Sequence, residues 1–164
     1  TGRKALARTS KTPGRTQHLV FFALDDQRRL VDLPGYGFAR VPEAVQRQWG
    51  ETMATYLQQR ESLAGLILLM DIRHPLTDYD WQMLDFSHHA ELPVHILLTK
   101  ADKLKRGPAQ NPLLAVRKQL ADYPLVSLQL FSATKKQGLE EALHVIGRWL
   151  DLEPDQGKQK KTPE

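Results

Sequence analysis

The sequence predicts an α/β fold with a mostly parallel sheet, one antiparallel edge strand and helices on both faces. Continuous apolar runs, typical of strands buried on both faces, alternate with segments whose apolar residues recur at helical spacing. Near the N-terminus, a short polar turn joins two strand-like segments, as in an antiparallel hairpin. The chain has 164 residues, enough for one domain with a sizeable core.

The first elements are expected to be a hairpin and a helix. Residues 17–24 are rich in β-branched and aromatic side chains and predict a strand, residues 25–27 supply a polar turn, and residues 29–33 predict a second strand. Pro-Gly-Tyr-Gly at 34–37 then ends the strand in a loop. Residues 42–59 carry apolar side chains at every fourth position, which predicts an amphipathic helix.

Three further runs, residues 63–70, 94–98 and 126–131, predict the parallel strands, and the first two are largely apolar. After the first run, Thr77 can cap a helix that continues to about residue 89. The side chains of this helix expected to face inward are Trp81, Met83 and Leu84. Between run and helix, Asp71 and Arg73 are close enough in sequence to form a loop ion pair, and no chemistry is assigned to them.

Two more helices are expected after the second and third runs. Asn111 followed by Pro112 is typical of a helix start. Residues 138–150 predict a closing helix. Its expected inward residues are Leu139, Leu143, Ile146 and Leu150. Residues 1–150 therefore predict one domain, and the polar residues 151–164 predict a disordered tail.

Composition and charge exclude several classes of protein. The chain contains no cysteine, which excludes disulfide frameworks and thiolate metal sites, and no apolar run reaches the roughly 18 residues that span a bilayer. The six histidines show no zinc-binding spacing. Residues 1–15 hold five basic side chains and no acid, so the net charge of +4 leaves −1 for the rest. This basic arm fits either a polyanionic partner, such as nucleotide phosphate or RNA, or an ordinary solvated terminus.

The predicted functional residues follow the strands, because ligands of open α/β sheets bind beyond the carboxyl ends of the strands. Asp32-Leu33-Pro34-Gly35 follows the second strand. Its aspartate can hold Mg²⁺ through a water molecule, and its glycine lets a backbone N–H approach a phosphate. Taken alone, the motif also fits an acidic residue at a tight turn.

A second motif, Thr99-Lys100-Ala101-Asp102, follows the strand at 94–98. A carboxylate at Asp102 can accept hydrogen bonds from N1–H and the exocyclic amino group of guanine, whereas adenine lacks both donors there. The aliphatic stem of Lys100 can lie over the base. The alternative is a lysine-rich loop in which Asp102 caps a turn.

Two weaker signals complete the series. Ser132-Ala133 follows the strand at 126–131, where a small residue lets a backbone N–H reach the carbonyl oxygen of the base. Thr16 precedes the first strand, and its hydroxyl is a suitable Mg²⁺ ligand when a γ-phosphate is present. Each of these two also fits an ordinary turn or strand start.

The order of these motifs is that of the switch and base-recognition motifs of GTP-binding domains. The stretches TSKTPGRTQ, DLPGYG, TKADKL and FSATKKQG resemble the EngB family, also called YihA or YsxC, over about residues 1–150. These are bacterial GTPases of ribosome biogenesis. The resemblance implies a P-loop GTPase-type three-layer sandwich in the cytoplasm. It also implies a role in assembly of the large ribosomal subunit, with links to cell division and septation.

The resemblance further implies a ligand, a metal and partners. The ligand is GTP or GDP, with Mg²⁺ held by Thr16 and, in its second shell, by Asp32. The implied partner is the large ribosomal subunit or its rRNA, and no membrane is involved. The sequence does not specify the oligomeric state, and a monomer is favoured for the intact protein. The implied GTP-binding residues are Gly14, Arg15, Thr16, Gln17, His18, Asp32, Leu33, Pro34, Gly35, Thr99, Lys100, Ala101, Asp102, Phe131, Ser132 and Ala133.

Two departures from the family pattern qualify this expectation. The sequence contains no G-x-x-x-x-G-K-[ST] phosphate-binding loop, so it is expected to be N-terminally incomplete and, alone, to bind GTP poorly. Tyr36 stands where many GTPases have the glutamine that orients the attacking water, so the catalytic residue is unassigned and hydrolysis is expected to be slow. The alternative function is a nucleotide-free remnant that binds RNA or the ribosome through its basic arm.

Overall fold

The structure is a computed structural model that describes residues 19–33, 55–57, 60–104 and 106–152. The chain divides into two compact units, residues 1–61 and 62–164. Of the helix predicted at 42–59, residues 55–57 are described and helical. The basic arm and most of the predicted tail lie outside the described residues.

The described part of the first unit is mainly an antiparallel hairpin. Its strands are β1 (Val20–Ala23) and β2 (Arg29–Asp32). Asp25 organises the turn, because its Oδ1 accepts hydrogen bonds from the backbone N–H of Gln27 at 2.9 Å and of Arg28 at 2.7 Å. The predicted hairpin is confirmed, with both strands shorter than the apolar runs suggested.

The second unit is built on a parallel sheet in the order β3 (Leu66–Asp71), β4 (Val94–Thr99) and β5 (Val126–Leu130). Leu66 pairs with Val94, which pairs with Val126, so the three strands start in register. The first five residues of the central strand β4 are all buried. This burial on both faces is the reason that its sequence is largely apolar rather than alternating, with His95 as the one polar side chain among the five.

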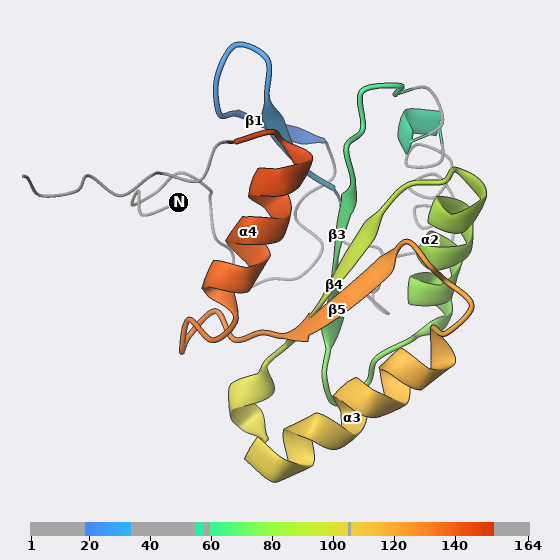
Figure 1. Cartoon of the computed structure of the whole chain (residues 1–164), viewed down its shortest axis with the longest axis vertical. Coiled ribbons are helices and arrows are strands. Elements are labelled where there is room, and N and C mark those ends of the chain that lie inside the picture. The colour runs from blue at the N-terminus through green and yellow to red at the C-terminus, as the bar shows by residue number, and fades with distance from the viewer. Residues whose placement is uncertain (1–18, 34–54, 58–59, 105, 153–164) are drawn as a thin grey trace, which may run out of the picture. The chain divides into compact units, whose positions relative to one another are not determined.

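Helices cover both faces of this sheet (Figure 1). α2 (Asp78–His89) packs against β3 and α3 (Arg106–Gln119) against β5, while α4 (Leu139–Trp149) lies on the opposite face. A Cβ atom at Gly65 would lie 2.5 Å from the ring of Trp149, so this close approach of ring and backbone requires glycine. The predicted three-layer α/β arrangement is confirmed.

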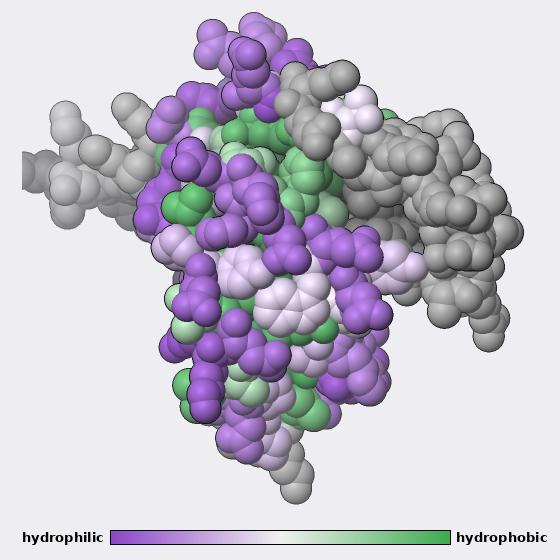
Figure 2. All heavy atoms as spheres, turned by 90° about the vertical axis from the view of Figure 1, so that its right-hand side faces the viewer, coloured by the Kyte–Doolittle hydropathy of each residue, from purple (hydrophilic) through white to green (hydrophobic). Residues whose placement is uncertain are grey.

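The core of the second unit is apolar and closely packed. Its side chains with an exposed fraction of at most 2% include Leu68, Met70, Ile72, Leu84, Ile96, Leu98 and Val116. Burying each such side chain contributes about 1.5–3 kcal/mol relative to leaving it in water. On the side of α2 and α3, hydrophilic side chains form most of the described outer surface (Figure 2). Among the described helices, none is long and apolar enough to span a membrane.

The start of α2 is as predicted. The Thr77 hydroxyl accepts a hydrogen bond from the backbone N–H of Asp80 at 3.4 Å, and the Asp80 carboxylate accepts one from the Thr77 backbone at 2.8 Å. This reciprocal capping satisfies two backbone donors at the helix start. Met83 and Leu84 are buried as expected, whereas Trp81 is only half-buried and lies beside the ring of Tyr123.

The start of α3 differs from the prediction. The helix begins at Arg106 and not at Asn111, so Pro112 lies inside it. Pro108 occupies the first turn of α3, where no intrahelical partner exists for the missing N–H, and it rather than Pro112 accompanies the start. The prediction of a helix start at Asn111 was therefore wrong.

The inward face of α4 differs from the prediction at Leu143, whereas the other predicted residues, Leu139, Ile146 and Leu150, are half-buried. Ala142 and Val145 are the buried residues of this helix, and Leu143 is 55% exposed. Successive helical residues point about 100° apart. A face centred on Ala142 and Val145 therefore turns Leu143 away from the sheet, and the smaller side chains permit close packing.

Candidate functional site

Two of the motifs expected from the sequence meet at the carboxyl ends of β4 and β5. After β4 the chain enters the short 3₁₀-helix η1 (Ala101–Lys103), which contains Asp102. After β5 it passes through Phe131 and Ser132. The backbone N–H of Ala101 donates to the carbonyl of Phe131 at 3.1 Å, so the two segments are joined by their main chains.

The side chains of Asp102 and Ser132 also join these segments. The hydroxyl of Ser132, which is fully buried, donates to Oδ1 of Asp102 at 2.6 Å. Oδ2 of Asp102 lies 3.8 Å from the ammonium of Lys103, and the Asp102 side chain is 13% exposed. The hydrogen bond from Ser132 holds the pKa of Asp102 below its ordinary value. Asp102 is therefore an ionised, oriented hydrogen-bond acceptor at neutral pH.

The loop after β5 is closed by its own hydrogen bonds. Ser132 and Gln137 pair through both backbone groups at 3.1 Å, and the Ser132 hydroxyl accepts the backbone N–H of Lys135 at 3.2 Å. Ala133 is an exposed residue of this closed loop. Ser132 therefore fixes the loop and the Asp102 carboxylate together.

A series of hydrogen bonds between His95, Gln129 and Gly138 supports the loop after β5. The carboxamide of Gln129 donates to the carbonyl of Gly138 at 2.6 Å, and its oxygen lies 2.8 Å from Nε2 of His95. Since the carboxamide oxygen accepts, Nε2 of His95 is assigned as the protonated nitrogen. Gly138 has a φ of 74°, and a Cβ there would lie 2.3 Å from both Gln129 Nε2 and the carbonyl oxygen of Leu130, so the position requires glycine.

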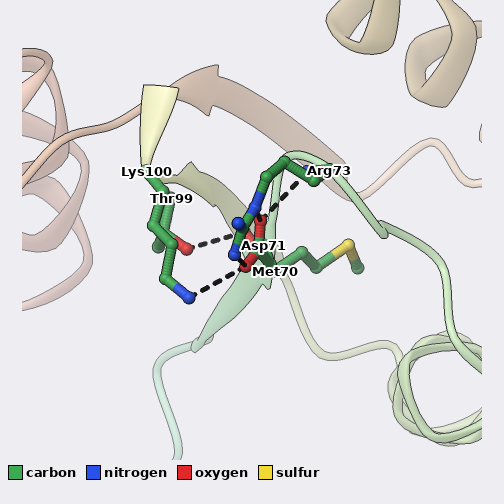
Figure 3. Close-up of polar contacts among 5 residues, drawn as sticks. All are labelled: Met70, Asp71, Arg73, Thr99 and Lys100. Carbon is green, nitrogen blue, oxygen red and sulfur yellow. Dashed lines mark hydrogen bonds and ion pairs between the residues drawn. The ribbon is translucent and has the colours of Figure 1, made fainter. Parts of the chain in front are cut away.

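On the other side, the TKAD segment is tied to the end of β3 (Figure 3). The Thr99 hydroxyl donates to the carbonyl of Met70 at 2.9 Å, and the Lys100 ammonium donates to Oδ2 of Asp71 at 2.9 Å. Arg73 binds both oxygens of the same carboxylate, through Nε at 2.9 Å and Nη2 at 2.6 Å. The Arg73 guanidinium and then the Lys100 ammonium hold the pKa of Asp71 well below its ordinary value.

The remaining predicted site residues belong to the first unit. Asp32 ends β2 with an exposed side chain, and Leu33 after it is half-buried. Within the described residues, no group of three or more acidic or histidine side chains could hold a metal ion. The other predicted residues lie outside the described part of the chain, namely Gly14, Arg15, Thr16, Gln17, His18, Pro34 and Gly35.

The Asp71–Arg73 ion pair was predicted from the sequence, but the connection of Asp71 to Lys100 was missed. Asp71 and Lys100 are 29 positions apart, and only the register of β3 with β4, which places Asp71 opposite Thr99, brings them together. The available signal was that both follow apolar runs assigned to one parallel sheet, whose carboxyl ends share an edge.

The family model described as "50S ribosome-binding GTPase" matches residues 1–100, more than half of the chain. The chain belongs to this GTPase family. Its members bind guanine nucleotides, and the predicted P-loop GTPase fold is confirmed.

Solved structures show the same fold at low identity. A crystal structure of a probable GTP-binding protein EngB is similar with a TM-score of 0.64 and 16% identity, over 82% of this chain and 84% of that one. Era in complex with MgGDPNP and nucleotides of 16S ribosomal RNA is similar with a TM-score of 0.60 and 20% identity, over 86% and 47%. The elongation factor SelB from Methanococcus maripaludis gives 0.60 and 17%, over 80% and 27%.

Proposed function

We propose that this GTPase-family chain recognises the guanine base of GTP and GDP through Asp102. The observation that carries the proposal is the Asp102 carboxylate, ionised and held by the buried Ser132 hydroxyl at the joined ends of β4 and β5. Each carboxylate oxygen has two lone pairs, so Oδ1 can accept a donor from the base in addition to Ser132. Guanine offers two neighbouring donors, N1–H and the exocyclic amino group, which match the two oxygens.

The same arrangement would reject adenine. Adenine has no donor at the corresponding positions, so its binding would leave the carboxylate desolvated and without partners. A buried polar group left in this way costs enough to separate two ligands by about 10⁴-fold. Lys100 and Ala133 are proposed to complete the base site, the first through its aliphatic stem and the second through its backbone N–H.

Mg²⁺ is proposed to bind together with the phosphates of the nucleotide. Asp32 is an exposed carboxylate at a strand end, which is chemically suited to hold a metal-bound water. Thr16, the proposed direct ligand, lies outside the described residues. When bound, the metal would neutralise charge on the phosphates, and hydrolysis is proposed to be slow, about 10⁻⁴ to 10⁻² s⁻¹ without a partner.

We further propose that GTP controls association with the large ribosomal subunit and that the chain has a role similar to that of EngB. The support is the family to which the chain belongs, the motifs that resemble EngB, and the solved EngB structure of which 84% is covered. The five basic side chains of residues 1–15 suit an RNA-rich partner. If they contact rRNA, replacing Arg3, Lys4 and Arg8 by glutamine will flatten the salt dependence of ribosome binding, whereas an unchanged slope would exclude this contact.

The test of base recognition is nucleotide competition. Fluorescent GDP with Mg²⁺ is displaced from the full-length protein by GDP, inosine diphosphate or ADP. Inosine diphosphate lacks only the exocyclic amino group, so we expect it to bind about 10–100-fold more weakly than GDP, and ADP about 10⁴-fold more weakly. Equal affinity for GDP and ADP would contradict the proposal.

A second measurement compares the GTP affinity of residues 1–164 alone with that of the full-length protein. These residues lack the G-x-x-x-x-G-K-[ST] loop that supplies backbone N–H groups and a lysine to the phosphates. We therefore expect them to bind GTP poorly or not at all. Tight binding of GTP by residues 1–164 would contradict this expectation and would assign the phosphate contacts to other residues.

A further inference from the structure

The Asp71 carboxylate gathers two cations from different segments of the chain. Arg73 donates three hydrogen bonds to it, from its backbone N–H at 3.0 Å, from Nε at 2.9 Å and from Nη2 at 2.6 Å. Lys100 donates one from Nζ at 2.9 Å. Figure 3 shows both side chains directed at the carboxylate, one from the loop after β3 and one from the end of β4. Arg73 thereby fixes the carboxylate that Lys100 binds.

Lys100 has a backbone conformation that its surroundings must maintain. Its φ of 60° lies in the left-handed region, which is unfavourable for a residue with a side chain. Hydrogen bonds hold the main chain on both sides of it. Thr99 accepts from the backbone N–H of Ile72 at 3.1 Å, and Ala101 donates to Phe131 at 3.1 Å. The turn at Lys100 is therefore set by the ends of β3 and β5 together.

The two charged side chains of the Thr99-Lys100-Ala101-Asp102 segment are thus held from opposite sides. Ser132, on the β5 side, orients Asp102. Asp71, on the β3 side, orients Lys100. A lysine side chain loses much of its rotamer freedom when it is immobilised. A partner that restricts Lys100 before the nucleotide arrives lowers the entropic cost of binding.

We propose that Asp71 is a positioning residue for guanine-nucleotide binding, which holds Lys100 in the orientation that covers the base, with Arg73 fixing the carboxylate. This inference rests on the proposed function. It assigns a role to two residues outside the expected nucleotide-binding motifs.

If net charge alone determined nucleotide affinity, Asp71→Asn would change that affinity in the opposite direction. Arg73, Lys100 and Asp71 together carry a net charge of +1, and Asp71→Asn raises it to +2. If only net charge mattered, the anionic nucleotide would bind the Asp71→Asn variant more tightly and an Arg73→Gln variant more weakly. If Asp71 positions Lys100, Asp71→Asn weakens binding although the site becomes more positive.

The experiment is a double-mutant cycle on GDP affinity in the full-length protein with Mg²⁺, using Asp71→Asn, Lys100→Met and both together. Methionine keeps an unbranched stem without the ammonium. Because ion pairs of this exposure couple weakly, we expect Asp71→Asn to weaken GDP binding about two- to fivefold. We expect no further loss when it is added to Lys100→Met.

Two controls separate this role from general damage. Asp25→Asn removes a similar turn aspartate, which is paired with Arg28 within the hairpin, and it should leave GDP affinity unchanged. The ratio of GDP to inosine diphosphate affinity should stay at the wild-type value in Asp71→Asn, because that ratio depends on Asp102.

Tighter or unchanged GDP binding by Asp71→Asn would overturn the inference. So would an equal loss in the wild-type and Lys100→Met backgrounds, because it would show that Asp71 acts independently of Lys100. Failure of the proposed function would look different. In that case the unmodified protein itself would not distinguish GDP from ADP.

Discussion

The two described parts of the molecule contain similar aspartate turns that differ in reach. In the hairpin, Asp25 accepts hydrogen bonds from Gln27 and Arg28, both within three positions of it. In the second unit, Asp71 makes the same kind of turn with Arg73 but also binds Lys100, 29 positions away. A local turn orders only itself, whereas a long-range one couples the ends of two strands. The candidate base site is built on contacts of the second kind.

The two parts also differ in how deeply their apolar side chains are buried, and the largest expected effect comes from removing one such side chain from each part. Leu98 is fully buried in β4, and Phe21 in β1 is 44% exposed. We expect Leu98→Ala to lower the free energy of unfolding by about 2–5 kcal/mol. Phe21→Ala should lower it by roughly 1 kcal/mol. Urea unfolding followed by circular dichroism measures both, and similar losses would show that the two parts do not differ in packing.

Alanine substitutions at two glycines of the second unit should have the next largest effect on stability. At Gly138 a Cβ would meet the Leu130 carbonyl oxygen at 2.3 Å and the φ is positive, so Gly138→Ala should destabilise the protein by at least about 1–2 kcal/mol. At Gly147, inside α4, a Cβ would meet no atom of the described residues within 4 Å. Gly147→Ala should therefore stabilise by about 0.5–1 kcal/mol through helix propensity. Thermal unfolding tests the opposite signs, and a tolerated Gly138→Ala would contradict the close approach beneath the loop.

The smallest effect concerns acid stability. Arg73 and Lys100 lower the pKa of Asp71, so its ionised form stabilises the folded state above the ordinary aspartate pKa of about 3.9, and this contribution is lost as the pH falls further. Asp71→Asn should thus be less stable than wild type at pH 6, by up to about 1 kcal/mol, and the difference should shrink towards pH 2. Urea midpoints at several pH values measure this. A difference that does not depend on pH would show that the charge is not responsible.

Much of the fold could be predicted because the signals are local. Largely apolar runs marked β3 and β4, β-branched and apolar residues marked β5, and the Thr77 hydroxyl marked the start of α2. The start of α3 was missed because Pro112 resembles a first helical residue, although the helix tolerates it in its interior. The inward face of α4 was missed because small Ala142 rather than large Leu143 packs on the sheet.

The residues of the candidate site also differ in whether a local sequence signal identifies them. Asp102 and Ser132 could be named from the sequence because each follows a predicted strand in a recognisable motif. The contact of Lys100 with Asp71 depends on which strands are neighbours and in what register, and a single sequence does not specify this. The role of Gln129 and His95 beneath the loop was hidden for the same reason, since they are 34 residues apart.

The most direct test of guanine recognition exchanges the hydrogen-bonding character of position 102. Asp102→Asn replaces one acceptor oxygen by an amide donor while keeping the shape that Ser132 contacts. In the full-length protein, we expect this variant to bind GDP about 100-fold or more weakly and to bind xanthosine diphosphate, which has a carbonyl in place of the amino group, more tightly than wild type does. Equal losses for both nucleotides, or unchanged affinity for GDP, would contradict recognition of guanine by Asp102.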